Sequence, residues 1–118
     1  MAHYLLRLAL TPETFKRFIT SPEDRRKAAA KLIEAHGGTL HNYFFAFGKH
    51  DVICLVEYPS NVDASAAMMT VASSGAFSGG ETTVLLTVDE AVEAMRRAGA
   101  KAGVYRAPGQ AKGGRGKK

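Results

Sequence analysis

The sequence has few of the features that mark secreted or membrane proteins. Its one cysteine, Cys54, cannot form an internal disulfide, and a lone thiol suits a reducing compartment. No apolar run approaches the roughly 20 residues that a bilayer-spanning helix needs. The N-terminus lacks a basic segment followed by a continuous apolar stretch, so we expect no signal peptide. These absences predict a cytoplasmic protein without a membrane partner.

Acidic residues are missing from the C-terminal segment, and this explains the formal net charge of +5. Residues 1–100 hold ten basic and eleven acidic residues, so the folded body is close to neutral. Residues 101–118 contain no acid and carry six basic residues: Lys101, Arg106, Lys112, Arg115, Lys117 and Lys118. The high pI therefore belongs to the C-terminal segment, and the body offers no electrostatic argument for binding nucleic acid.

Residues 101–118 are rich in glycine and lysine and poor in apolar residues, which predicts a disordered tail after a domain at residues 1–100. Basic, glycine-rich arms neutralise phosphates without reading a sequence, so the tail is one candidate for binding nucleic acid. The alternative interpretation is a solubilising terminus.

The most informative stretch is a predicted hairpin, with strands over 39–47 and 52–58. We expect a positive φ at Gly48 in its turn. Phe45 and Phe47 point one way and Phe44 the other, so the first arm is apolar on both faces, as is the second. A hairpin in a small domain normally leaves one face to water, so something should cover the second face.

The other elements follow from local signals. A strand over 4–10 precedes a helix that starts at Thr11-Pro12, restarts at Ser21-Pro22 and ends at Gly37-Gly38. Ser60 can cap a second helix over 63–71. Its apolar residues at helical spacing are Val62, Ala66, Met69 and Ala72.

The C-terminal part of the domain is predicted to be a loop over 73–80 and a strand over 81–87. A capping box formed by Thr87 and Glu90 should begin a last helix that runs through Ala98. Met68 and Met69 are interpreted as core filling.

The resulting order predicts an α+β, ferredoxin-like βαββαβ fold with an extra C-terminal helix. Both crossing helices would cover one face of a four-stranded antiparallel sheet. Each large apolar side chain that becomes buried gains roughly 1.5–3 kcal/mol, so an apolar second face favours a homo-oligomer. A two-fold dimer is expected, with a trimer or hexamer as alternatives. The final helix could instead fold back over part of that face, which would weaken the argument for an oligomer.

Several of these segments together resemble the GYD-domain family. They are Tyr4-Leu5-Leu6, the helix ending in Gly37-Gly38, the turn 47–52, the alanine-rich second helix with Gly75, and the strand 81–87. The resemblance spans residues 3 to 95 and implies a dimeric α/β-barrel type of assembly. The family's tyrosine in the Gly-Tyr-Asp turn is replaced by His50 here, and the resemblance implies no assigned activity.

His50 and Asp51 are the candidate catalytic residues. A histidine titrates near neutral pH, and an adjacent carboxylate could assist it in proton transfer. The alternative is structural, because Asp commonly accepts backbone N–H bonds in turns.

The candidate ligand-binding residues are Arg7, His41 and Tyr43. His41 and Tyr43 share a strand face at period two with Phe45 and Phe47, which would suit an apolar pocket with few polar anchors; the alternative is that both are half-exposed at the strand end. Arg7 lies in an apolar strand, so it should either pair with Glu57 or receive an anionic ligand.

No metal site or cofactor is expected. The histidines at 3, 36, 41 and 50 lack zinc-motif spacing, and the serine–glycine segments lack the lysine of a phosphate loop. Three functions stay open: a homo-oligomeric small-molecule-binding or structural module, which we favour; a cofactor-independent monooxygenase or isomerase of the dimeric-barrel type; and an accessory protein that binds nucleic acid through its tail.

Overall fold

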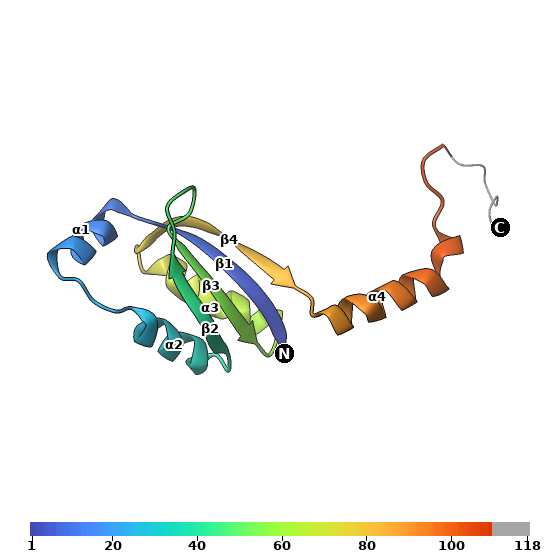
Figure 1. The fold of residues 1–118 in the computed structure, drawn as a ribbon, viewed down its shortest axis with the longest axis horizontal. Helices are drawn as coiled ribbons and strands as arrows, with labels where there is room; N and C mark the ends of the chain where they lie inside the picture. The colour runs from blue at the N-terminus through green and yellow to red at the C-terminus, as the bar shows by residue number, and fades with distance from the viewer. Residues whose placement is uncertain (110–118) are drawn as a thin grey trace. The chain divides into compact units, whose positions relative to one another are not determined.

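The computed structural model describes residues 1–109 and has an α+β fold (Figure 1). The chain divides into two compact units, Met1–Leu85 and a second that begins at Leu86. The first unit holds the sheet and three helices. Within residues 1–109, no helix has both the length and the apolar character that crossing a bilayer requires.

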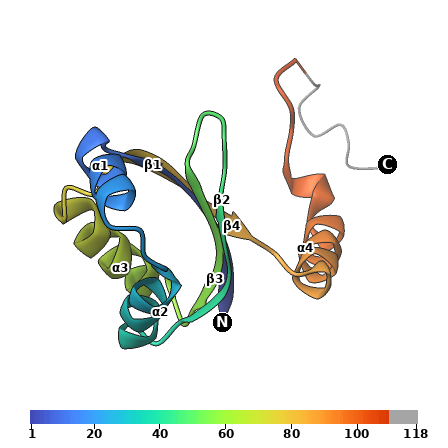
Figure 2. The same ribbon diagram turned by 60° about the vertical axis from the view of Figure 1, so that its left-hand side comes forward.

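The first unit follows the predicted order of elements, with the first crossing helix divided into two. Its elements are β1 (Ala2–Leu10), α1 (Pro12–Thr20), α2 (Arg26–Ala35), β2 (Thr39–Phe45), β3 (Val52–Tyr58), α3 (Asn61–Ser73) and β4 (Phe77–Leu85). The strands form one antiparallel sheet in the order β2-β3-β1-β4. All three helices lie on one side of the sheet (Figure 2). This arrangement is consistent with the predicted ferredoxin-like topology.

The core lies between the sheet and the helices. Alternate residues of β1 and β3 point into it, as strand geometry requires. The buried strand residues are Tyr4, Leu6, Leu8 and Leu10 of β1 and Val52, Cys54, Val56 and Tyr58 of β3. The helices contribute the buried side chains of Ile33 and Ala67. The two predicted strands are confirmed, and each buries one of its two faces against the helices.

Local signals set the ends of the helices that precede β2. Thr11 caps α1 by accepting a hydrogen bond from the Thr14 N–H, and Pro12 takes the first helical position. The break predicted at Pro22 is a complete separation between α1 and α2. Gly37 has a φ of +79° after α2, the left-handed conformation that a helix C-terminus favours in glycine.

Helix α3 presents a different face to the core from the predicted one. Ala67 is buried and Met68 is partly buried against the core, whereas Val62 and Met69 are 78% and 72% exposed. The interpretation of Met69 as core filling is therefore wrong. The helix is apolar on nearly every side, so the spacing of its apolar residues could not select the inward face.

The hairpin turn is longer than predicted. Strand β2 ends at Phe45, and the Ala46 N–H donates to the Asp51 carbonyl across a loop that leaves Phe47 fully exposed. Gly48 does not have the positive φ that a tight turn would have required. A longer loop can reverse the chain direction without a left-handed residue at this position.

Strand β4 begins before the predicted point, at Phe77, so the glycines at 79 and 80 lie in a strand and not in a loop. A Cβ added to Gly80 would lie 2.6 Å from the Arg7 carbonyl oxygen and 2.8 Å from Leu8 Cδ2. Glycine is therefore needed here because β4 passes close to β1, a tertiary reason that strand propensity does not express.

The second face of the sheet carries no helix of the first unit (Figure 2). We call it the helix-free face, since α1, α2 and α3 all lie on the other side. Its apolar patch consists of Leu5, Phe44, Ile53 and Leu55, which the strand pairing places in neighbouring rows. Polar residues surround this patch: His3, Arg7, His41, Glu57, Glu81 and Thr83. The helix-free face is therefore mixed, and the expectation that it is apolar throughout is wrong.

The second unit contains α4 (Val88–Ala100) and a short 3₁₀ helix at Ala102–Val104. The predicted capping box is confirmed, because Glu90 N–H donates to Thr87 Oγ1 while Thr87 N–H donates to the Glu90 carboxylate. Residues 110–118 lie outside the described residues. They include four of the six basic residues of the predicted tail, so tail disorder and nucleic-acid binding stay predictions.

Candidate functional site

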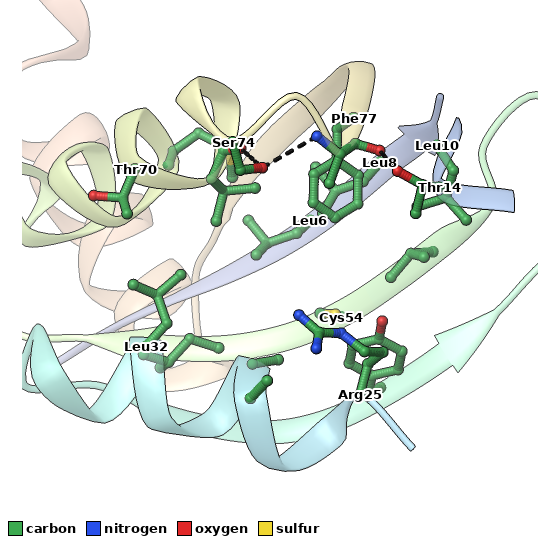
Figure 3. Close-up of a pocket in the computed structure, with 18 of the residues that line it drawn as sticks. Leu6, Leu8, Leu10, Thr14, Arg25, Leu32, Cys54, Thr70, Ser74 and Phe77 are labelled. Carbon is green, nitrogen blue, oxygen red and sulfur yellow. Dashed lines mark hydrogen bonds between the residues drawn. The ribbon is translucent and has the colours of Figure 1, made fainter. Parts of the chain in front are cut away.

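A cavity of about 390 Å³ lies between the sheet and the three helices of the first unit (Figure 3). Its floor is the buried face of β1 and β3, and α2 and α3 form opposite walls. Ala28 and Ala29 of α2 are among the lining residues. Most of the lining is apolar, including Leu6, Leu8, Leu32 and Phe77.

Charged side chains lie at one side of the cavity, where α1 ends and α2 begins. Arg17, Glu23 and Arg25 belong to its lining, so the two cations outnumber the one anion. Arg25 Nη1 lies 3.6 Å from Glu23 Oε1, and both side chains remain about half exposed. Figure 3 shows the Arg25 side chain among the residues that line the cavity. This side of the cavity can therefore accept an anionic group.

Tyr43, Cys54 and Tyr58 are the strand residues of the cavity lining that carry a hydroxyl or thiol. Burial raises the pKa of Tyr43, Cys54 raises it further by a smaller effect, and the charge of Arg25 opposes them. Burial also raises the pKa of the Cys54 thiol to about 11. Both groups are therefore protonated at neutral pH, which suits hydrogen bonding but makes Cys54 a poor nucleophile.

His41 and Tyr43 do not share a face, contrary to the prediction. The pairing of β2 with β3 shifts between Leu40 and Asn42, which makes His41 the extra residue of a bulge. A bulge inserts one residue and reverses the alternation beyond it. Tyr43 consequently packs against the core and lines the cavity, whereas His41 contacts Glu57 on the opposite face of the sheet.

One hypothesis from the sequence was that Arg7 pairs with Glu57. The structure does not show this pair. Arg7 Nη1 donates a hydrogen bond of 3.0 Å to Thr83 Oγ1 on β4. In the sheet register Arg7 lies opposite Ile53 and Glu81, while Glu57 lies opposite His3. Arg7 is on the helix-free face, so it does not belong to the cavity.

Asp51 has a structural contact that accounts for its position after the hairpin loop. Its Oδ2 accepts a 2.9 Å hydrogen bond from the Leu10 N–H, and its own N–H donates to the Leu8 carbonyl. The sequence predicted, as one alternative, that Asp51 would accept a backbone hydrogen bond from within the turn. The donor is instead Leu10 on β1. Within residues 1–109, the His50 side chain makes no hydrogen bond to Asp51, and neither residue lines the cavity.

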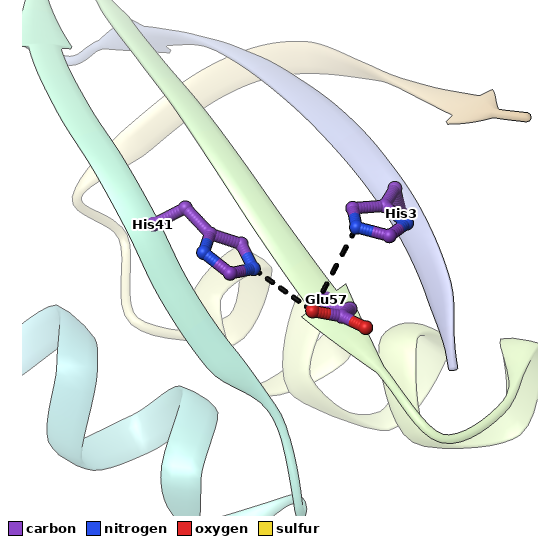
Figure 4. Close-up of side chains that lie close together, drawn as sticks. All are labelled: His3, His41 and Glu57. Atoms are coloured by element: carbon purple, nitrogen blue, oxygen red, sulfur yellow. Dashed lines mark hydrogen bonds and ion pairs between the residues drawn. The ribbon is translucent and has the colours of Figure 1, made fainter. Parts of the chain in front are cut away.

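The sequence analysis missed a group of three side chains on the helix-free face. Glu57 Oε1 lies 2.9 Å from His41 Nε2 and 3.7 Å from His3 Nε2 (Figure 4). The hydrogen bond with His41 lowers the pKa of Glu57, which the charges of His3 and His41 lower further against the opposing effect of burial. The sequence could have indicated part of this group, because His3 lies at the start of β1 and Glu57 near the end of β3, two strands that pair in antiparallel.

Comparisons with known proteins place the chain in a family. The GYD domain family matches residues 4–95. No curated protein matches the chain. Two solved structures of Atu4242 from Agrobacterium tumefaciens are similar. One shares 13% identity with a TM-score of 0.46 and covers 75% of this chain and 94% of that chain.

The other solved structure is described as a nipsnap family protein with unknown function. It shares 16% identity with a TM-score of 0.42 and covers 71% of this chain and 86% of that chain. The family match, which extends from β1 into α4, is the finding that identifies the chain. This protein is a member of the GYD domain family.

Proposed function

We propose that this protein is a homo-oligomeric module that binds a small, mainly apolar molecule with an anionic group and does not transform it. The observation that carries the proposal is the cavity of about 390 Å³ between the sheet and the helices. Small-molecule sites typically occupy roughly 300–1,000 Å³ and combine apolar walls with a few polar groups. Leu6, Leu8 and Phe77 form such walls, and Tyr43 offers a hydroxyl.

The charges at the α1–α2 side support an anionic group on the ligand. Among residues 1–109, the ion pair of Arg25 is a 3.6 Å contact with the half-exposed Glu23, a separation longer than a strong charged hydrogen bond. A carboxylate or sulfonate entering the cavity could therefore approach Arg25 without breaking a buried ion pair. Arg17 adds a second positive charge nearby.

The pKa values of Tyr43 and Cys54, which lie on the cavity floor, favour binding over catalysis. Catalytic groups usually have pKa values moved toward neutrality, so that they can transfer protons or attack as anions. Here burial moves the pKa values of Tyr43 and Cys54 upward, away from neutrality. The enzyme hypothesis relies on His50, His41 or Tyr43 around an apolar cavity. Tyr43 lines the cavity, but both histidines are absent from its described lining, so they supply no group there that titrates near neutral pH.

The helix-free face supports the homo-oligomeric part of the proposal. Phe44 is 60% exposed beside the half-buried Leu5, Ile53 and Leu55. Covering these side chains with the same patch of a second copy would remove them from water, and a two-fold contact of identical patches is the commonest closed arrangement. The ligand cavity and the oligomer contact would then lie on opposite faces of one sheet.

Two related fluorescent probes can test cavity binding, because one carries a sulfonate and the other is neutral. We expect 8-anilinonaphthalene-1-sulfonate to bind the cavity and to slow modification of Cys54, which lines it. The thiol reagent should be applied at alkaline pH, since burial raises the pKa of Cys54 to about 11. Because Cys54 is the chain's one cysteine, its protection locates the probe.

Matched variants separate the cavity from the rest of the surface. Ala29→Leu fills the cavity and should weaken probe binding about tenfold, which corresponds to about 1.4 kcal/mol. Ala35→Leu, on an exposed position of the same helix, should not weaken it. Arg25→Gln should weaken the sulfonate but not neutral N-phenyl-1-naphthylamine, whereas Lys31→Gln should affect neither. Undiminished binding to Ala29→Leu, with Cys54 unprotected, would exclude the cavity as the site.

A further inference from the structure

Three ligating side chains from distant parts of the sequence meet at one end of the helix-free sheet face. His3 on β1 and Glu57 on β3 are directly opposite in the antiparallel register. His41 belongs to β2 and reaches Glu57 because it is the bulged residue of that strand. Three paired strands therefore hold the backbone positions of the group, which we call the His-Glu cluster.

The distances in the His-Glu cluster are close to those of a metal site. One ligand atom from each residue lies within 4.8 Å of the other two. A tetrahedral zinc ion with bonds of about 2.0–2.1 Å separates its ligand atoms by roughly 3.3 Å. The His3–Glu57 separation of 3.7 Å and the His41–Glu57 separation of 2.9 Å bracket that value. Small side-chain rotations would bring the three atoms around one ion.

The orientation of the side chains also fits a shared ion. The imidazole rings of His3 and His41 are nearly parallel, with an interplanar angle of 17° and centroids 6.0 Å apart. Figure 4 shows a nitrogen of each ring directed toward the Glu57 carboxylate from either side. Glu57, His3 and His41 side chains are 22%, 30% and 38% exposed, so an ion can reach them from solvent.

The donor types restrict the metal. Two imidazoles and one carboxylate suit borderline divalent ions such as Zn²⁺ and Co²⁺, whereas Mg²⁺ and Ca²⁺ prefer oxygen ligands. Three protein ligands leave at least one coordination position for water or another molecule. The N-terminal ammonium is close enough to lower the pKa of Glu57, whereas Arg7 on the same strand is hydrogen-bonded to Thr83 and separated from His3 by Leu5.

One contact limits the expected affinity. His3 Nδ1 is buried and has no hydrogen-bond partner among the described residues. A metal-bound imidazole usually donates its other N–H to an acceptor, and loss of that contact typically weakens metal binding by about 10–100-fold. We therefore expect micromolar affinity and not the tighter binding of a structural zinc site.

We propose that His3, His41 and Glu57 form a binding site for a divalent transition metal of the Zn²⁺ class, with an open coordination position at the end of the helix-free sheet face. This site is separate from the cavity, which lies on the other face of the sheet. It does not depend on the proposed function, and its failure would leave cavity binding intact.

The full-length protein can be titrated with Co²⁺ followed by visible absorption, and with Zn²⁺ in competition with a chromophoric chelator. We expect one equivalent of metal and an intense Co²⁺ spectrum typical of four-coordination. His41→Gln and Glu57→Gln should each weaken binding by at least about tenfold, because each removes a ligand atom. His36→Gln and His50→Gln are matched controls, since they remove an imidazole elsewhere, and should bind like the unmodified protein.

Thermal unfolding with and without Zn²⁺ gives a second readout. Metal that binds the folded state should raise the midpoint of the unmodified protein and of both control variants, but not of the two cluster variants. A hydrogen-bonded group with only a structural role would instead lower the midpoint in His41→Gln and Glu57→Gln without any metal dependence. That result, or equal metal affinity in all five proteins, would overturn the proposal.

Discussion

Replacing Tyr4 with alanine is expected to lower the free energy of unfolding by about 3–5 kcal/mol. Tyr4 is 1% exposed and packs edge-on against Tyr58, with ring centroids 5.7 Å apart. Its hydroxyl donates a 2.6 Å hydrogen bond to Asn61 Oδ1 at the start of α3. The substitution would thus leave a cavity between β1, β3 and α3. Urea unfolding followed by circular dichroism measures the change.

Tyr4→Phe is the matched control because it keeps the ring and removes only the hydroxyl. It should cost about 0.5–1.5 kcal/mol, the usual contribution of one hydrogen bond. If Tyr4→Ala proved no more destabilising than Tyr4→Phe, the ring would not fill the core as described.

Gly80→Ala is expected to destabilise the fold by about 1–3 kcal/mol, the usual range for forcing extra volume into a packed site. The new Cβ would lie 2.6 Å from the Arg7 carbonyl oxygen, and backbone atoms of β1 cannot yield without disturbing the β1–β4 pairing. The measurement is again the midpoint and slope of urea unfolding.

Gly79→Ala is a close control, one residue away in the same strand. A Cβ at Gly79 meets no atom within 4 Å, and the position has no positive φ. Alanine there should be neutral or stabilise by up to about 1 kcal/mol, since it restricts the unfolded chain. Equal effects at the two positions would mean that β4 does not pass β1 as closely as described.

Features set by neighbouring residues could be predicted from the sequence. The strands β1 and β3, the Thr11-Pro12 helix start and the capping box of Thr87 and Glu90 depend on short-range geometry and local apolar pattern. The order of elements then led to the observed antiparallel sheet. Family membership likewise followed from the order and spacing of short segments.

Features that depend on tertiary contacts could not be predicted. The bulge at His41 reverses which side chains of β2 face the core, and nothing in the local pattern marks it. Helix α3 is apolar on most sides, so only packing decides that Ala67 faces inward and Met69 outward. Gly80 was predicted to lie in a loop, because the sequence does not reveal that β1 passes close to it.

The candidate site shows the same division. Tyr43 was selected as a pocket residue, and it does line the cavity, whereas its supposed neighbour His41 lies on the other face. The cavity itself arises from the placement of three helices over the sheet, and Arg25 lines it because α1 and α2 are separate helices. The His-Glu cluster requires the strand register, since its members are far apart in the sequence.

The two faces of the sheet therefore have different proposed roles. The helix-covered face holds the cavity proposed to bind a ligand. The helix-free face holds the apolar patch proposed as the oligomer contact and, at one end, the His-Glu cluster. Phe44→Asp should disrupt the oligomer because Phe44 lies in the apolar patch, while Phe47→Asp should not, since Phe47 is fully exposed on the hairpin loop outside that patch.

Native mass spectrometry of protein taken directly from cells tests the proposed function most directly, because it reports subunit number and retained molecules together. We expect a mass of two or more chains with a small molecule that is released on unfolding. Ala29→Leu should keep the subunit number and lose the small molecule. A mass of one chain at micromolar concentration, with nothing retained, would contradict both the homo-oligomer and the occupied cavity.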